Sequence, residues 1–183
     1  FRASLGGIGY LRDRKVRLTG TTPLRDDSSA LAGELAARLG SGWRARGGLV
    51  WNPNDDVVQQ ALARISYRGD ADRIFSAGYR LRDGLSTSTD LGLIWPLGRE
   101  TRAIARWNYS LSEHRNLDAV AGIEYGRCCW RLRALLRQQV TGTGDGQNLS
   151  FLLQLELKGL GKLGDNIDAL LNDGIYGYRR EDD

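Results

Sequence analysis

Apolar and polar side chains alternate along most of this chain, in runs of nearly constant length. In the clearest run, 148–158, one face carries Leu149, Phe151, Leu153 and Leu155, and largely polar side chains lie between them. A period of two residues is typical of a β-strand with two different faces. Comparable runs predict about ten strands, and they lie at 1–12, 29–39, 42–52, 56–68, 73–82, 88–95, 100–111, 116–126, 130–140 and 148–158.

Short turn-like stretches separate these runs, among them GSG at 40–42, GDAD at 69–72, PLGR at 96–99 and TGTGDGQN at 141–148. Strands joined by such turns pair with their chain neighbours in antiparallel fashion. Most runs contain about 9–11 residues, the length that crosses a bilayer when a strand is tilted. The pattern therefore predicts an all-β protein built as an antiparallel meander.

Both a soluble sandwich and a transmembrane barrel alternate in this way, and two details favour the barrel. Aromatic residues collect near the strand ends in two bands, as in the girdles of a lipid-facing wall; one band holds Trp43, Tyr67, Phe75, Trp95, Tyr125 and Trp130, the other Trp51, Trp107 and Tyr109. The polar faces carry many arginines, whose burial in a dry core would be prohibitively costly. We therefore expect an antiparallel transmembrane β-barrel with a wet lumen.

We expect residues 1–158 to supply about ten strands of a larger closed barrel. The chain begins with Phe1 and contains no methionine, so we expect a fragment or a processed product. Residues 159–183 have a different pattern and predict a short tail, with a glycine-rich exit and one short helix, DNIDALLND, capped by Asp165. This tail leaves the sheet on the same side as the turn at 126–129.

The residues give little support to an enzyme. His114, the only histidine, lies in a predicted loop, and no nucleophile elbow or phosphate-binding glycine loop is present. We expect no enzymatic activity, no cofactor and no metal site. The net charge is +4, but the arginines share strands with lipid-type apolar faces and do not interleave with stacking aromatics, which disfavours nucleic acid as a partner.

The two cysteines, Cys128 and Cys129, are adjacent and lie at a predicted turn between two strands. A disulfide between neighbours in the chain is strained. The turn at 126–129 is short, and short barrel turns face the periplasm, where disulfides persist. Partners elsewhere, or two inert buried thiols, remain open alternatives; a zinc site is disfavoured, because no second Cys or His cluster exists.

The sequence resembles the C-terminal part of the LptD family of outer-membrane lipopolysaccharide-assembly proteins of Gram-negative bacteria. The resemblance covers nearly the whole chain and is clearest from about Ala71 onward. It is carried by DADRIFSAGYRLRDG, LIWPLGRETRAIARWNYSL, IEYGRCCWRLRALLR, FLLQLELKGLG and DALLNDGIYGYR.

This resemblance implies that Cys128 and Cys129 form disulfides with an N-terminal periplasmic domain that this chain does not contain. It further implies a lateral opening, of which strand 148–158, with Leu149, Phe151, Leu153 and Leu155, would line one edge. The implied partners are lipopolysaccharide, a plugging lipoprotein, LptE, and the periplasmic lipopolysaccharide bridge proteins. The implied location is the outer membrane, with the turns at 40–42, 69–72, 96–99 and 126–129 and the tail on the periplasmic side.

For the inward arginines we expect a cationic lumen path for lipopolysaccharide along Arg102, Arg106, Arg131, Arg133 and Arg137. The alternative for these arginines is charge balance, with Glu34, Glu124 and Glu156 as partners. For the whole chain the alternatives are a passive anion-selective porin, in which a ring of inward arginines sets selectivity, and a soluble β-sandwich that binds anionic glycans.

Overall fold

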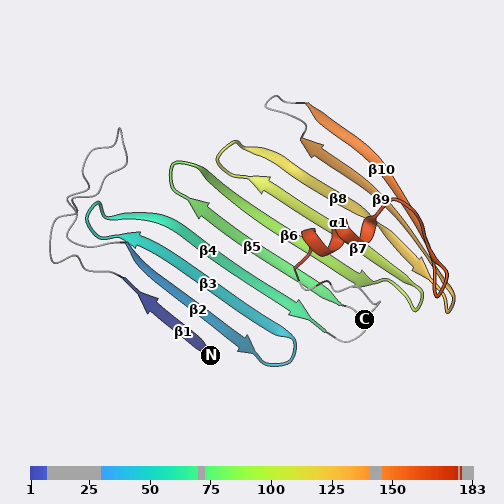
Figure 1. Ribbon diagram of the computed structural model, residues 1–183, viewed down its shortest axis with the longest axis horizontal. Coiled ribbons are helices and arrows are strands. Elements are labelled where there is room, and N and C mark those ends of the chain that lie inside the picture. The colour runs from blue at the N-terminus through green and yellow to red at the C-terminus, as the bar shows by residue number, and fades with distance from the viewer. Residues whose placement is uncertain (8–29, 70–72, 141–145, 177, 179–183) are drawn as a thin grey trace.

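A single antiparallel sheet forms almost all of the structure, a computed structural model that describes residues 1–7, 30–69, 73–140, 146–176 and 178 (Figure 1). Its strands follow one another in chain order. They are β1 Arg2–Gly6, β2 Leu31–Leu39, β3 Trp43–Asn52, β4 Val57–Arg68, β5 Ile74–Arg82, β6 Ser86–Pro96, β7 Thr101–Ser110, β8 Arg115–Gly126, β9 Trp130–Val140, β10 Gln147–Leu157 and β11 Gly161–Gly164; one helix, α1 Ile167–Gly174, follows. The predicted all-β antiparallel meander is confirmed.

The first and last strands differ from the sequence prediction. The first predicted strand, 1–12, contains the shorter β1, and residues 8–12 lie outside the described part of the chain. The expected glycine-rich exit contains a strand of its own, because Gly159, at a φ of 83°, lets the chain turn back after β10. β11 then pairs with the second half of β10, from Gln154 opposite Gly164 to Leu157 opposite Gly161.

The sheet has two chemically different faces. One, the apolar face, exposes large hydrophobic side chains along every strand from β2 to β10, including Leu35, Leu49, Ile65, Leu91, Trp107, Ile123, Leu136 and Phe151. Exposed apolar area on this scale indicates an interaction surface or contact with lipid. Aromatic rings on this face pack together near both ends of the strands: Trp43 lies 4.9 Å from Tyr67, Tyr125 lies 5.4 Å from Trp130, and Trp107 lies 5.5 Å from Tyr109.

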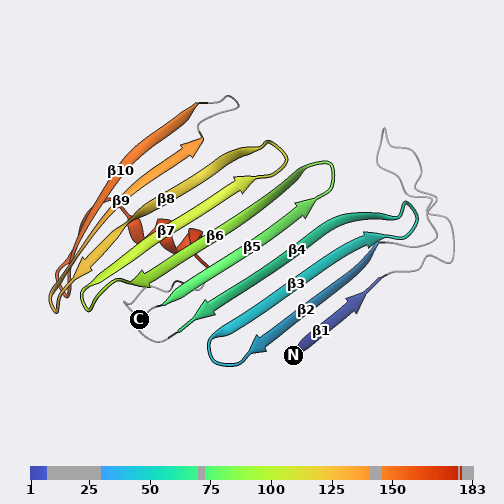
Figure 2. The same ribbon diagram turned by 180° about the vertical axis from the view of Figure 1, so that it is seen from behind.

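The opposite face, the charged face, carries α1. In Figure 1 the helix lies in front of β6 to β8, and in Figure 2, turned by 180°, the strands lie in front of the helix. Ile167, Leu171 and Ile175 stand on one side of the helical segment, at a spacing of four residues, and are fully buried. They pack on apolar side chains of five strands, namely Ile74, Ile94, Ile104, Val120 and Leu135. Part of the face expected to be wet is therefore a dry core.

The N-terminus of α1 is capped by Asn166 rather than by the predicted Asp165. The Asn166 side chain accepts a hydrogen bond from the Ala169 N–H at 3.2 Å. Asp165 instead accepts a hydrogen bond from the Leu153 N–H of β10 at 2.8 Å and so caps the strand edge.

Gly92 allows the helical segment to approach the sheet, since a Cβ there would lie 3.2 Å from Cγ2 of Ile175. Within the described residues, no helix has the length and apolar character needed to cross a membrane.

Candidate functional site

Cross-strand register places opposite charges side by side on the charged face of β7 to β10. Arg102 lies opposite Glu124, Glu124 opposite Arg133, and Arg131 opposite Glu156. Nε of Arg102 donates to Glu124 at 2.6 Å, and Nε of Arg133 donates to the other oxygen of Glu124 at 2.5 Å. Arg131 completes the group, 3.7 Å from Glu124 and 3.6 Å from Glu156.

Asp118 bridges the remaining two arginines of the predicted path. Arg106 reaches one Asp118 oxygen at 2.6 Å, and Arg137 reaches the other at 2.8 Å. All the arginines predicted to line the path (Arg102, Arg106, Arg131, Arg133 and Arg137) therefore lie on the charged face, each with a carboxylate partner. Two of the partners named from the sequence, Glu124 and Glu156, take part; Glu34 forms no ion pair with any described residue.

Asp168 joins α1 to this network. Nη1 of Arg133 lies 2.6 Å from Oδ1 of Asp168, and Nζ of Lys162 lies 2.8 Å from Oδ2. The Tyr178 hydroxyl donates to Oδ1 at 3.2 Å. Burial on its own would raise the pKa of Asp168, but the Lys162 hydrogen bond and the Arg133 charge outweigh it and lower the pKa to about 2. Burial, together with the Asp168 charge, raises the pKa of Tyr178 to about 12.

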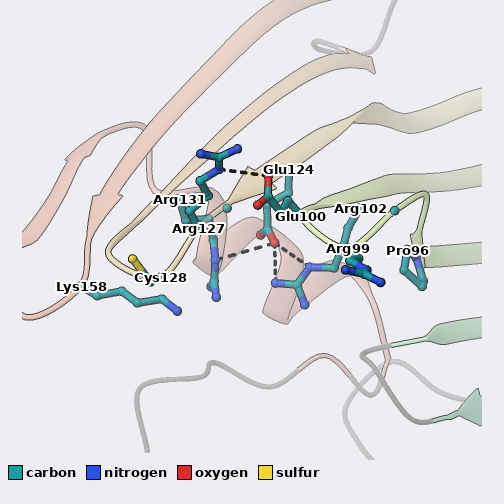
Figure 3. Close-up of a pocket in the computed structure, with 11 residues that line it drawn as sticks. Pro96, Arg99, Glu100, Arg102, Glu124, Arg127, Cys128, Arg131 and Lys158 are labelled. Carbon is teal, nitrogen blue, oxygen red and sulfur yellow. Dashed lines mark hydrogen bonds and ion pairs between the residues drawn. The ribbon is translucent and has the colours of Figure 1, made fainter.

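A cavity of about 830 Å³ opens between the β6–β7 turn, the β8–β9 turn and the end of β10. Figure 3 shows Arg102, Arg127 and Arg131 gathered around two carboxylates, Glu100 and Glu124, with Lys158 and Cys128 to one side. Hydrogen bonds from the Tyr125 hydroxyl and from Arg127 lower the pKa of Glu100. Arg99 also lines the cavity, so its basic groups outnumber its acidic ones.

Cys128 lines this cavity, and Cys129 follows it in the same turn. Both thiols are exposed and unbonded to other cysteines, and their sulfurs are 2.7 Å apart. The hydrogen bond with Cys128 raises the pKa of the Cys129 thiol. The Lys158 N–H donates to the Cys129 carbonyl at 3.0 Å, so the chain leaves β10 beside the cysteine turn, as the sequence predicts.

The predicted edge strand, β10, lies next to the sheet edge. Leu149 and Phe151 are the most exposed of its apolar residues, at 70% and 63%, while Leu153 is less exposed and Leu155 is half-buried. β9 pairs with the whole strand, whereas β11 pairs only with its second half. Within the described residues, Gln147–Leu152 thus have no strand on their second side.

Sequence reasoning did not identify Asp118, Lys162 or Asp168 as parts of the network. The only signal for Asp118 is its register, since its strand places it beside Arg106 and Arg137 on the same face. Asp168 and Lys162 join through tertiary packing of α1 and β11, which no local pattern encodes.

A meander with one exposed apolar face, aromatic rings near both strand ends and one charged face is the wall of a membrane β-barrel. The family model described as "LptD: LPS transport system D" matches residues 1–111. The chain therefore belongs to the LptD family, and the resemblance seen in the sequence is confirmed.

Proteins that are similar to this chain over almost its whole length are named LPS-assembly protein LptD. The protein of Nitrosococcus oceani is 36% identical over 97% of this chain, and that of Alkalilimnicola ehrlichii is 38% identical over 97%. The Pseudomonas aeruginosa protein is 31% identical over 98% of the chain. In each case this chain spans 24% of the relative's own length.

Proposed function

We propose that this chain is one section of an outer-membrane β-barrel that delivers lipopolysaccharide to the outer leaflet of Gram-negative bacteria. The observation that carries the proposal is that one sheet of an LptD-family chain has an exposed apolar face on one side and a charged face on the other. Lipid tails would contact the apolar face, and a hydrated, phosphorylated headgroup would pass along the charged face. No bond is made or broken in this role.

The predicted path arginines, Arg102, Arg106, Arg131, Arg133 and Arg137, would form a polar wall for the sugars of the headgroup. Their ion pairs support such a wall, since paired groups offer hydrogen bonds to hydroxyls without holding an anion tightly. The exposed Leu149 and Phe151, with Leu153 and Leu155, would line the lateral opening through which acyl chains leave.

The proposal includes the partners and topology that the family resemblance implies. The cysteine turn and the tail would face the periplasm, and Cys128 and Cys129 would form disulfides with an N-terminal domain of the longer protein. The exposure of both thiols supports this assignment. LptE would plug the complete barrel, and the periplasmic bridge proteins would supply lipopolysaccharide at the cysteine end.

The proposal is tested in cells whose only copy of the full-length protein is expressed from a regulated promoter. Shutting off expression should deplete lipopolysaccharide from the cell surface, with accumulation at the inner membrane. A passive porin predicts a different result, namely a loss of anion permeability with surface lipopolysaccharide unchanged.

A further inference from the structure

A second group of arginines lies on the charged face, far along the sheet from the ion-paired network. The register places Arg38 of β2 directly opposite Arg44 of β3, and Arg46 of β3 directly opposite Arg64 of β4. Like charges directly opposite on neighbouring strands destabilise a sheet. In β7 to β10 the register instead places arginines opposite carboxylates, as with Arg102 opposite Glu124 and Arg131 opposite Glu156.

These four residues, which we call the arginine cluster, have little compensation within the described structure. Arg64 meets one carboxylate across the strands, with Nη2 lying 3.6 Å from Oδ1 of Asp90. The Nε atom of Arg64 is buried and has no hydrogen-bond partner among the described residues. In the described part of the chain, Arg38, Arg44 and Arg46 form no ion pair with a carboxylate.

The arginine cluster surrounds a cavity of about 650 Å³, which Arg2, Ser66 and Tyr176 also line. Tyr176 follows α1 in the chain, and the Arg64 guanidinium lies 4.9 Å from the centre of its ring. The helix segment thus supplies one wall of the cavity. The cavity lies toward the turn at 40–42, the same end of the meander as the cysteines.

We propose that the arginine cluster binds phosphate groups of an anionic glycolipid as it passes along the charged face; this inference rests on the proposed function. Arginine's planar fork fits phosphate oxygens in bidentate fashion, and a phosphate between two opposed guanidinium groups turns their repulsion into attraction. The ion-paired wall of β7 to β10 and the arginine cluster then have different tasks. The wall contacts neutral sugar, and the cluster holds charge.

The test measures binding to the purified full-length protein in detergent, with bis-phosphorylated lipid A as one probe and inorganic phosphate as the other. The double variant Arg44→Gln with Arg46→Gln should raise the Kd for bis-phosphorylated lipid A about tenfold or more, the effect of losing a charge-assisted contact. The same variant should have a higher Tm than wild type without ligand, because repulsion is relieved.

The matched control is Arg80→Gln with Arg82→Gln, which removes two charges from the same face. Arg80 and Arg82 lie opposite uncharged residues, so this variant should bind like wild type. Competition by millimolar inorganic phosphate supports phosphate recognition, and tighter binding of lipid A than of phosphate identifies the lipid as the source.

Two results would overturn the inference. One contradicts only the arginine cluster as the phosphate site, and the other also contradicts the proposed function. If the Arg44→Gln, Arg46→Gln protein binds lipid A as wild type does, the cluster is not the phosphate site, but the proposed function stands. If wild-type protein binds neither probe, both the cluster assignment and the glycolipid function fail. Arg38→Gln provides a second, milder variant that should weaken binding in the same direction.

Discussion

Asp168 is the residue through which α1 is tied electrostatically to the sheet. Its carboxylate forms ion pairs with Arg133 of β9 and Lys162 of β11 and accepts a hydrogen bond from the Tyr178 hydroxyl. The apolar side of the helix packs on five strands. Arg133 is only 1% exposed, and removing one partner from a buried ion pair leaves charge uncompensated. The position of the helix should therefore depend on the ionised form of this one carboxylate.

Asp168→Asn should lower the free energy of unfolding of the full-length protein by about 2 kcal/mol at neutral pH, from the depressed pKa. The ordinary pKa is 3.8 and the folded value about 2, so the stabilisation is nearly complete at about pH 5 and is lost as the pH falls from there through 2. Denaturant titration at several pH values measures this difference. Asp173→Asn, an exposed change in the same helix, should have no such effect; equal stability of wild type and Asp168→Asn at pH 7 would contradict the assignment.

The role of the cysteine doublet can be tested by substitution. Because Cys128 and Cys129 are both exposed, each can reach a separate partner in the longer protein. Single Cys→Ser variants should retain one link, whereas the double variant should lose both and lower surface lipopolysaccharide. Non-reducing gels of the full-length protein report the links directly. Wild-type migration and normal delivery in the double variant would show that the doublet has no tethering role.

The place of α1 on the sheet could not be predicted from the sequence. The strands that it covers contribute one apolar residue each, such as Ile104 between Arg102 and Arg106. In any single strand such a residue is an isolated exception on a polar face. Only the register of five strands assembles them into a surface that a helix can cover. By contrast, the period of two was sufficient to predict β2 to β10, each to within two residues at either end.

The ion pairs on the charged face could be predicted only in part from the sequence. Alternation predicted that Arg102, Arg131 and Glu124 share a face, but their contacts depend on strand register, which alternation alone leaves undetermined. The prediction of Asp165 as the helix cap is wrong, although an aspartate before a helix is a common cap. Here the Leu153 N–H at the sheet edge takes its carboxylate, and Asn166 caps the helix.

β11 covers only part of the free edge of β10. It pairs with β10 only up to Gln154, and Asp165 extends the contact by accepting from the Leu153 N–H at 2.8 Å. Asp165→Ala should leave that amide without its acceptor, at a cost of about 1 kcal/mol, and speed its hydrogen exchange by roughly fivefold. Asp165→Asn keeps an oxygen acceptor and is the control. Unchanged exchange at Leu153 in Asp165→Ala would show that the carboxylate does not secure this edge.

The same pairing limits how a larger barrel can close at β10. Any strand of the longer protein that joins this edge meets β11 over Gln154–Leu157 and can pair freely only with Gln147–Leu152. A seam with few hydrogen bonds opens more easily than a full ladder. This geometry supports β10 as one border of the proposed lateral opening.

For the molecule as a whole, we propose that the sheet separates membrane lipid from lipopolysaccharide in transit. β4 offers a matched pair of positions for testing it. Leu62 lies on the charged face beside the arginine cluster, whereas Ile65 lies on the apolar face and is exposed. Both belong to one strand, so expression and assembly of the two variants should be alike.

The most direct measurement is photo-crosslinking in living cells, with a photoreactive amino acid at position 62 or 65 of the full-length protein. Position 62 should form adducts with lipopolysaccharide that disappear when delivery from the inner membrane is blocked, whereas position 65 should react with phospholipid. Transport-dependent lipopolysaccharide adducts at position 65, with none at position 62, would contradict this proposal.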